Sequence, residues 1–281
     1  MSFDAAFIGY KNYFTATAST LSAVGVTSGY SVNSLKNWQP FSFVSFDAGS
    51  NSITIDCGSA VSVDYFAIAA HELFTSNTDN IILKASALSN FSTSVTLATI
   101  NNVSSGVYDG SYRFNTSTNI PSQTVNDNYV VCLKLDSVSY RYYRLEFTSS
   151  VAVRIAVMCL GQRTEFELGF YKGIQPPKLN EDIVVTNNKS ESGVYLGRSI
   201  VRTGVKPTTI NLDKMSHSWL ENTWLPFKQS AEVNPFIFSF GNTPLYNNQF
   251  CYQTSFAPVK YDDRIGGGHG SCGITFEGVI K

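Results

Sequence analysis

Hydrophobic and polar positions alternate along much of the first half of this chain. In segment 52–58 three apolar residues alternate with polar ones, which is the period-two pattern of a half-buried strand. Gly58 then breaks the pattern, and the next apolar run predicts a second strand over 62–69. These two strands, joined by a short polar turn and preceded by Trp38, predict the edge of a β-sandwich.

Further strands are expected downstream at regular spacing. We predict them over 81–86, 129–135, 140–147 and 153–160. The last of these is apolar on both faces, as in a central strand. Short strands with almost no helical period between them are typical of an antiparallel sandwich. Segment 101–123 lacks a regular pattern and is predicted to be a long excursion, and segments of this kind are commonly functional or mobile.

The second half of the chain is predicted to form a separate β-rich domain. A linker is expected over 163–177, because Pro176 and Pro177 stiffen the chain there. The strands predicted beyond it are 182–186, 197–202, 234–240, 250–252 and 274–279. The predicted division is therefore an N-terminal arm and sandwich over 1–162 and a second domain over 178–281.

One amphipathic helix is predicted in the second domain, over 211–220. Asn211 is its expected N-cap, since its side chain can accept from the first free backbone N–H groups. The segment 224–227 is expected to end the helix. The residues expected to share its buried face are Leu212, Met215, Ser216, Trp219 and Leu220.

The composition agrees with a folded protein and excludes some classes of function. Of the 281 residues 43% are hydrophobic and 14% aromatic, whereas only 15% are charged, against about 25% in typical soluble domains. Low charge and many aromatic side chains suit surfaces that become buried in assemblies. The net charge is −1 and no basic run is present, so nucleic-acid binding is not expected.

Targeting signals and disulfides are not expected either. The first seven residues lack the basic and apolar regions of a secretory signal, and no apolar run of about 18 residues predicts a membrane span. The five cysteines are odd in number and have no C-x-x-C spacing. We therefore predict reduced cysteines in a protein made in a reducing cytosol.

Gly270-Ser271-Cys272-Gly273 is the most enzyme-like stretch of the chain. It resembles the nucleophile loop of chymotrypsin-like viral cysteine proteases, with His71 as a possible base. Such a site needs an activated thiolate and a substrate-binding strand after it, yet only eight residues follow Gly273. A glycine-rich loop before a last strand is the favoured interpretation, and no enzyme is predicted.

No metal or cofactor is predicted. The three histidines are scattered without ligand spacing, and the glycine-rich loop lacks the Gly-Lys-Ser/Thr of a phosphate-binding loop. No pair of acidic residues is singled out for glycoside hydrolysis. Asp47 or Asp79 could hold calcium through oxygen ligands, but a solvated carboxylate is the favoured interpretation of each.

The order of motifs over about 30–160 resembles a discoidin-like (coagulation factor 5/8 type C) jelly roll. After Trp38 come "ITIDCG", "VDYFAI", "ILKASALSNFST", "RYYRLEF" and "VRIAVMCL", in the places of the family's strands. The paired terminal cysteines of many extracellular members are absent. If the sandwich binds sugar, aromatic and amide side chains would do so, and the candidates are Trp38, Phe74, Asn77, Tyr108 and Tyr112. For Trp38 core packing is favoured over ligand contact, because large aromatic side chains are usually buried.

The pattern over most of 178–281 resembles tail-tip proteins of tailed bacteriophages, near the distal tail proteins. It is carried by "SESGVYLGRSIVR", a helix with tryptophan, "NPFIFSF", Pro244-Leu245-Tyr246 and a final "ITFEGVI". The resemblance implies a symmetric ring below the tail tube. The residues predicted to form the ring contacts are Trp219, Trp224, Phe227, Phe236 and Phe238.

Together these observations predict a structural virion protein of a phage tail tip or baseplate, made in the host bacterial cytoplasm. Its expected partners are further copies in a trimeric or hexameric ring, other tail proteins, and a host cell-surface polysaccharide. The alternative is a free-standing, lectin-like carbohydrate-binding protein. A cysteine protease that uses Cys272 is the less favoured third possibility.

Overall fold

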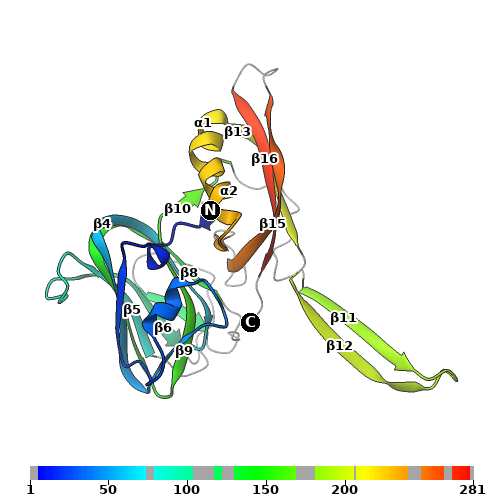
Figure 1. Ribbon diagram of the computed structural model, residues 1–281, viewed down its shortest axis with the longest axis horizontal. Coiled ribbons are helices and arrows are strands. Elements are labelled where there is room, and N and C mark those ends of the chain that lie inside the picture. Colours follow the sequence, from blue (N-terminus) through cyan, green and yellow to red (C-terminus); the bar gives the residue numbers. More distant parts are fainter. Residues whose placement is uncertain are drawn as a thin grey trace. The chain divides into compact units, whose positions relative to one another are not determined.

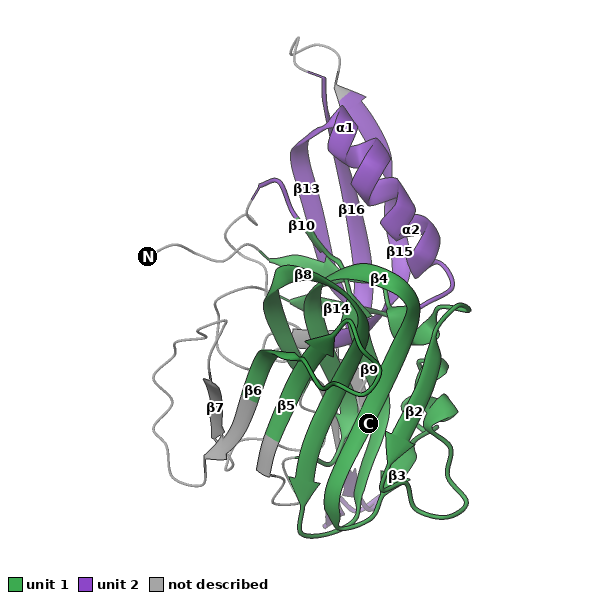
Figure 2. Ribbon diagram, turned by 90° about the vertical axis from the view of Figure 1, so that its left-hand side faces the viewer, with its two compact units in different colours: residues 1–165, 236–248, 281 green, residues 166–235, 249–280 purple. Residues whose placement is uncertain are grey.

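The structure is a computed structural model of the 281-residue chain. It describes residues 6–73, 79–103, 117–121, 130–168, 181–205, 207–239, 248–262 and 268–278. The chain divides into two compact units, which Figure 2 colours separately: unit 1 holds 1–165, 236–248 and 281, and unit 2 holds 166–235 and 249–280. The predicted sandwich segment, 1–162, lies within unit 1.

Unit 1 is built from β-strands with two short 3-10 helices. The strands are β1 (Phe7–Gly9), β2 (Thr20–Val24), β3 (Val44–Phe46), β4 (Gly49–His71), β5 (Asp79–Ser86), β6 (Val95–Val103), β7 (Ser117–Pro121), β8 (Val131–Ser149), β9 (Val153–Gly161), β10 (Arg163–Glu165) and β14 (Phe236–Ser239). The 3-10 helices are η1 (Tyr13–Thr15) and η2 (Val32–Lys36). The main sheet has the order β3-β9-β4-β8-β5-β6-β7, with β2 on β4, and all its pairs are antiparallel except β6 with β7.

A long two-stranded ribbon of β4 and β8 forms both layers of the sandwich. The sequence predicts a strand break at Gly58, but β4 continues for 23 residues, and β8 likewise merges two predicted strands. The prediction is wrong because the extra residues between Asp56 and Val61 form a bulge, with Gly58 at φ +76, instead of ending the pairing. Figure 2 shows the ribbon curving over at this bend.

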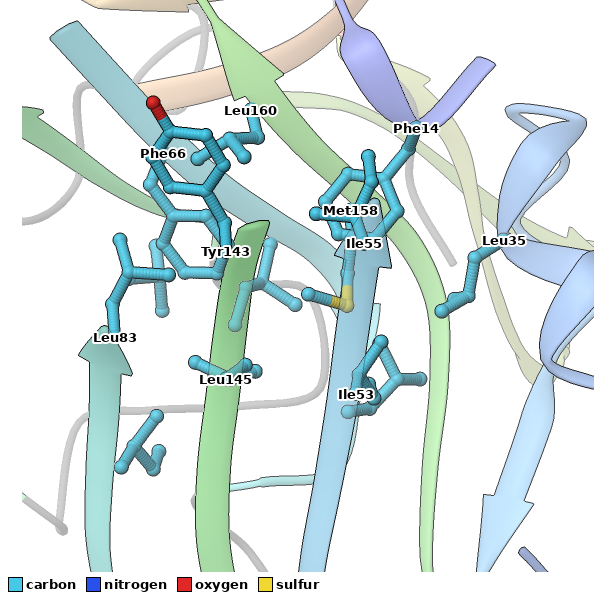
Figure 3. Close-up of a cluster of buried hydrophobic side chains, with 14 of the residues drawn as sticks. Phe14, Leu35, Ile53, Ile55, Phe66, Leu83, Tyr143, Leu145, Met158 and Leu160 are labelled. Carbon is cyan, nitrogen blue, oxygen red and sulfur yellow. The ribbon is translucent and has the colours of Figure 1, made fainter. Parts of the chain in front are cut away.

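The hydrophobic core lies between the two halves of this ribbon. Ile53 and Ile55 come from one half of β4, and Phe66 comes from the other (Figure 3). The buried Tyr143 hydroxyl closes the bend, because it donates to the Val61 carbonyl at 2.8 Å and accepts from the Tyr140 N–H at 3.1 Å. Alternating apolar residues thus fold the ribbon onto itself and bury one cluster.

The N-terminal arm is fastened to this sandwich. Asn12 is buried, and its amide donates to the Met158 carbonyl at 2.9 Å while its oxygen accepts from the Leu160 N–H at 3.1 Å. Ahead of it, β1 pairs with both β10 and β14. A side chain at Gly161 would place its Cβ 2.0 Å from the Lys11 carbonyl oxygen, so this close approach requires glycine.

Unit 2 contains a hairpin, a sheet and a helix. The hairpin consists of β11 (Glu181–Lys189) and β12 (Tyr195–Val205), which pair only with each other among the described strands (Figure 1). The remaining strands are β13 (Thr208–Ser216), β15 (Asn248–Asp262) and β16 (His269–Gly278), with β16 between the other two.

The helix of unit 2 begins later than the sequence predicts. It runs through α1 (His217–Trp219), the π-helical turn η4 (Leu220–Trp224) and α2 (Leu225–Ala231). Ser216, not Asn211, is the N-cap, and its hydroxyl accepts from the Trp219 N–H at 3.1 Å. The predicted start is wrong because Ile210 and Leu212 are buried at strand spacing, in register with β16.

The helix also ends later than predicted. It continues past segment 224–227 to Ala231, with Pro226 in the first turn of α2. Proline has no N–H and clashes with the carbonyl four residues earlier in a regular helix. A π turn lies just before Pro226 and changes the hydrogen-bond spacing there, and the helix continues through the proline.

The predicted fold class is confirmed. The protein is mostly β, with an antiparallel sandwich and a β-rich segment that carries one amphipathic helix. The buried face of that helix consists of Trp219, Leu220, Trp224, Phe227 and Ala231. Within the described ranges, no helix has the length and apolarity that crossing a membrane would require.

Candidate functional site

The glycan-binding residues predicted from the sequence are only partly visible. Trp38 is buried, with 7% of its surface exposed, so it packs in the interior, as the favoured interpretation of this residue predicts. The other candidates, Phe74, Asn77, Tyr108 and Tyr112, lie outside the described residues. A candidate site in the described part of the sandwich therefore has to consist of other side chains.

One end of the sandwich brings three strand ends together. The last residue of β3, Phe46, pairs with the first residue of β9, Val153. The last residue of β4, His71, pairs with Ile155 of the same strand. Val153 and Ile155 are fully buried, so Arg154 between them points to the outer face.

Four side chains meet on this outer face, and we name them the Arg154 cluster: Tyr30, Phe43, Glu72 and Arg154. The Tyr30 and Phe43 rings are stacked, with centroids 5.5 Å apart and planes at 30°. The Arg154 guanidinium carbon lies 4.9 Å from the Phe43 centroid. Its Nη1 lies 4.0 Å from Glu72 Oε1, and the Glu72 N–H donates to the Arg154 carbonyl at 2.9 Å.

The loop that carries Tyr30 is held to the sandwich by several hydrogen bonds. The Tyr30 N–H donates to the Thr27 carbonyl at 3.1 Å, and the Thr27 N–H donates to the Ser45 carbonyl of β3 at 2.9 Å. The Thr27 hydroxyl donates to Asp47 Oδ1 at 2.7 Å. Gly25 has φ +83, and a Cβ there would lie 1.8 Å from Asn51 Oδ1, so this turn requires glycine.

The exposure of the cluster lets it act on a ligand. Tyr30 is 42% exposed and the Arg154 side chain is 54% exposed. Stacked aromatic rings offer an apolar face, whereas a guanidinium offers several N–H donors and a carboxylate offers acceptors. Together they can bind a small molecule that presents both C–H and hydroxyl groups.

Metal binding has no site in the described part of the chain. No group of three or more histidine, cysteine, aspartate or glutamate side chains lies there in positions that could hold an ion. The carboxylate of Asp47, a calcium candidate in the sequence, instead accepts the hydroxyl of Thr27.

The predicted ring contacts are not on the surface. Trp219, Trp224, Phe227, Phe236 and Phe238 are all buried. Trp224 stacks with Trp219 at 5.9 Å and meets the edge of Phe227 at 5.4 Å. Side chains that fill the interior of their own chain cannot also present a surface to a partner. An assembly surface, if the protein has one, has to consist of other residues.

The thiol of the protease alternative is unsuited to nucleophilic attack. Cys272 lies inside β16 and is buried, and desolvation raises its pKa to about 12, with a smaller contribution from the charge of Asp213. Such a thiol stays protonated at neutral pH, whereas a nucleophilic cysteine needs the thiolate. All five cysteines are free and buried.

Comparison with known proteins gives distant likenesses only. No protein-family model and no curated protein matches the chain. Similar solved structures include chitosan-binding module 1 of a chitosanase/glucanase from Paenibacillus sp. IK-5, with 12% identity and a TM-score of 0.39 over 54% of this chain and 99% of the module. The family 32 carbohydrate-binding module of Clostridium perfringens NanJ, in complex with galactose, has 14% identity and a TM-score of 0.36 over 56% of this chain and 98% of the module.

A GH29 fucosidase from Ruminococcus gnavus, in complex with fucose, is also similar, with 13% identity and a TM-score of 0.40. The likeness covers 55% of this chain and 27% of the fucosidase, so the chain matches about a quarter of that enzyme. At these levels the likenesses concern the fold alone.

Sequence reasoning missed all four residues of the Arg154 cluster. It ranked aromatic residues by their place in loops, whereas the cluster depends on which strand ends are neighbours. One signal was available: Arg154 is the single charged residue within the apolar run 153–160. A charge inside a buried strand must point outward, where it can serve a binding surface.

Proposed function

We propose that the sandwich of unit 1 binds carbohydrate through the Arg154 cluster. The observation that carries the proposal is the stacked Tyr30–Phe43 pair beside the Arg154–Glu72 pair on an exposed face. A sugar ring has an apolar C–H face that fits an aromatic side chain, and hydroxyl groups that pair with guanidinium and carboxylate. A ligand with only one of these two features would use only half of the cluster.

The rigidity of the cluster supports the same function. Its backbone is fixed by the strand register and by the hydrogen bonds of Thr27, and the Arg154 side chain rests against the Phe43 ring. Side chains that are already held in place lose little conformational freedom on binding. The cluster can therefore bind a small, polar ligand that offers limited contact area.

A glycan array probed with the full-length chain tests this proposal, and the best-binding glycan is then titrated against variants. Tyr30→Ala and Arg154→Ala are each expected to weaken binding about tenfold, or ~1.4 kcal/mol. Tyr252→Ala is the matched control, because Tyr252 is 41% exposed but belongs to unit 2. Unchanged affinity in both cluster variants would contradict the proposal.

A structural subunit of a phage tail tip or baseplate is the second candidate function. It is favoured by the β11–β12 hairpin, whose tip carries three consecutive exposed apolar residues: Val194 at 60%, Tyr195 at 57% and Leu196 at 67%. A two-stranded hairpin is only marginally stable alone in water, and exposed apolar side chains at its tip favour a partner. Further copies in a ring, or neighbouring tail proteins, would supply that partner.

Mass photometry of the full-length chain tests this second candidate. Trimers or hexamers are expected, and a triple variant with serine at Val194, Tyr195 and Leu196 is expected to be monomeric. Leu88→Ser removes a comparably exposed apolar side chain in unit 1 and should leave the assembly intact. Rings that persist in the triple variant would show that the hairpin tip is not the contact.

A further inference from the structure

A second polar surface lies on the other layer of the sandwich, formed by β2, the first half of β4, the second half of β8, β5 and β6. Strand register places one row of side chains across it: Ser22, Thr54, Arg144, Lys84 and Thr96. Residues next to this row, such as Ile55 and Leu145, point into the core. The row therefore points outward, and none of it belongs to the Arg154 cluster.

Arg144 is held in a fixed orientation at the middle of this row. Its Nε–H donates to Thr54 Oγ1 at 2.9 Å, and its guanidinium carbon lies 3.9 Å from the Phe91 ring centroid. Its Nη1 is 3.8 Å from Glu146 Oε1, which is too far for a hydrogen bond. Glu146 instead pairs with Lys84 at 2.6 Å. Among the described residues, the Nη groups of Arg144 have no hydrogen-bond acceptor.

The contact between Phe91 and Arg144 comes with an unfavourable backbone conformation. Phe91 has φ +53, in the left-handed region that bulky residues rarely adopt. The surrounding loop maintains it: the Phe91 N–H donates to the Leu88 carbonyl at 3.2 Å, and the Ser92 N–H donates to Asn90 Oδ1 at 3.0 Å. Strain that a fold maintains is found mainly at sites that bind or react.

We propose that this face binds a saccharide that carries a carboxylate, such as a uronic acid. The Nη edge of Arg144, which has no hydrogen-bond acceptor among the described residues, would receive the carboxylate through two parallel hydrogen bonds, the geometry that guanidinium favours. Arg144 and Lys84 carry two positive charges and Glu146 carries one negative charge, so one positive charge is left in excess. The hydroxyl groups of the row, among them Thr54 and Thr96, pair with sugar hydroxyls. Phe91 and Thr54 act as positioning residues, because they hold the guanidinium.

The ligand is assigned as a saccharide and not an acidic peptide because of that hydroxyl row. An acidic peptide would engage Arg144 with one carboxylate, but its backbone offers no hydroxyl groups beside that carboxylate. A sugar acid offers a carboxylate and several hydroxyls within one ring, and these match the row on both sides of Arg144. The protein would then carry two saccharide sites of different charge preference, one on each layer.

Calorimetric titration of the full-length chain tests the inference with defined probes: tetragalacturonate, tetramannuronate, and their carboxyl-reduced neutral counterparts. At least one uronate is expected to bind, and its reduced counterpart at least tenfold more weakly. This comparison needs no variant, so it does not depend on how any variant folds. Equal affinity for the acidic and reduced forms, or no binding of either uronate at millimolar concentration, would overturn the inference.

Variants then locate the site. Arg144→Lys keeps the charge but loses the paired donors, and should weaken uronate binding at least tenfold; Thr54→Val should weaken it about threefold. Arg141→Lys, on the same strand, is the matched control because Arg141 is paired with Asp56. Tyr252→Ala in unit 2 should leave uronate binding unchanged. The acidic and reduced probes test this inference alone, so it and the proposed function fail separately. Equal uronate affinity in Arg144→Lys, or equally tight binding of polyglutamate, would contradict the assigned site.

Discussion

At the scale of single residues, Asn12 shows how one buried polar side chain can hold an arm in place. Its amide group satisfies the Met158 carbonyl and the Leu160 N–H of β9, and its oxygen also accepts from the Phe14 N–H at 3.0 Å. These backbone groups lie next to the edge of the core, where water cannot replace the lost partner. The arm is thereby joined to the sandwich by hydrogen bonds as well as by apolar contact.

Asn12→Ala should lower the free energy of unfolding by about 2–4 kcal/mol, because it leaves buried backbone groups without partners. Urea unfolding followed by circular dichroism measures this change. Asn33→Ala, at an exposed asparagine, is the control and should change stability by less than about 0.5 kcal/mol. Similar stability of the two variants would contradict the role given to Asn12.

Asp56 predicts a pH dependence. Its carboxylate accepts two hydrogen bonds from the Arg141 guanidinium, at 2.7 and 2.9 Å, and this side-chain hydrogen bonding lowers the pKa of Asp56. A carboxyl whose pKa is lower in the folded state stabilises the fold above its unfolded pKa of about 3.9, and this stabilisation is lost as pH falls through the folded pKa.

The free energy of unfolding of the wild-type protein, measured with urea, should therefore fall between pH 6 and a pH below 4. The fall should be larger than that of Asp56→Asn over the same range. The difference between the two proteins should narrow as the pH falls. In an Arg141→Gln background, Asp56→Asn should have a smaller effect on the pH dependence, because the main partner is gone and the Gly58 N–H still donates to Asp56. Identical pH profiles of wild type and Asp56→Asn would count against this interaction.

At the scale of elements, the boundary between β13 and the helix depends on a single hydroxyl. Ser216 Oγ accepts from the Trp219 N–H and donates to Glu167 Oε1 at 2.6 Å. Ser216→Ala should therefore destabilise the protein by about 1 kcal/mol, as loss of an N-cap does. Asn211→Ala, at the cap predicted from the sequence, should be nearly neutral. Chemical denaturation of both variants distinguishes the two positions. A larger loss of stability in Asn211→Ala than in Ser216→Ala would contradict the role given to Ser216.

Strand positions could be predicted from the sequence, whereas the places where strands continue, bulge or give way to a helix could not. Alternation located β5, whereas a continuous apolar run located β9, because nearly every residue of β9 is buried. It missed that β4 continues past Gly58, since a bulge and a turn have the same local glycine signal. It also misplaced the helix start, because Leu212 and Met215 fit a helical face as well as a bulged strand.

The Arg154 cluster could not be predicted because it depends on long-range register. Phe43 and Arg154 are more than a hundred positions apart, and only the pairing of β3 with β9 makes them neighbours. The sequence candidates for a sugar site other than Trp38 lie outside the described residues, so they stay a prediction. Trp38 and Phe43 are both aromatic residues, yet Trp38 is buried, so residue type alone does not separate core from surface.

At the scale of the whole molecule, the two units carry different kinds of surface. Unit 1 presents stacked aromatic and charged side chains on a rigid sandwich, as a binding module would. Unit 2 buries the aromatic residues of its helix and exposes apolar side chains at the tip of a two-stranded hairpin, which suits attachment to other proteins. We therefore infer that carbohydrate binding and assembly are separable functions, and that variants in one unit should leave the other function unchanged.

The most direct measurement of the central claim is an NMR titration of the isotope-labelled full-length chain with the best glycan from the array. We predict that the backbone and side-chain signals of Tyr30, Phe43, Glu72 and Arg154 shift in a saturable manner. In Arg154→Ala the shifts of the other three residues should saturate only at about tenfold higher glycan concentration. Saturable shifts that leave these four residues unaffected, or the absence of any binding glycan, would contradict it.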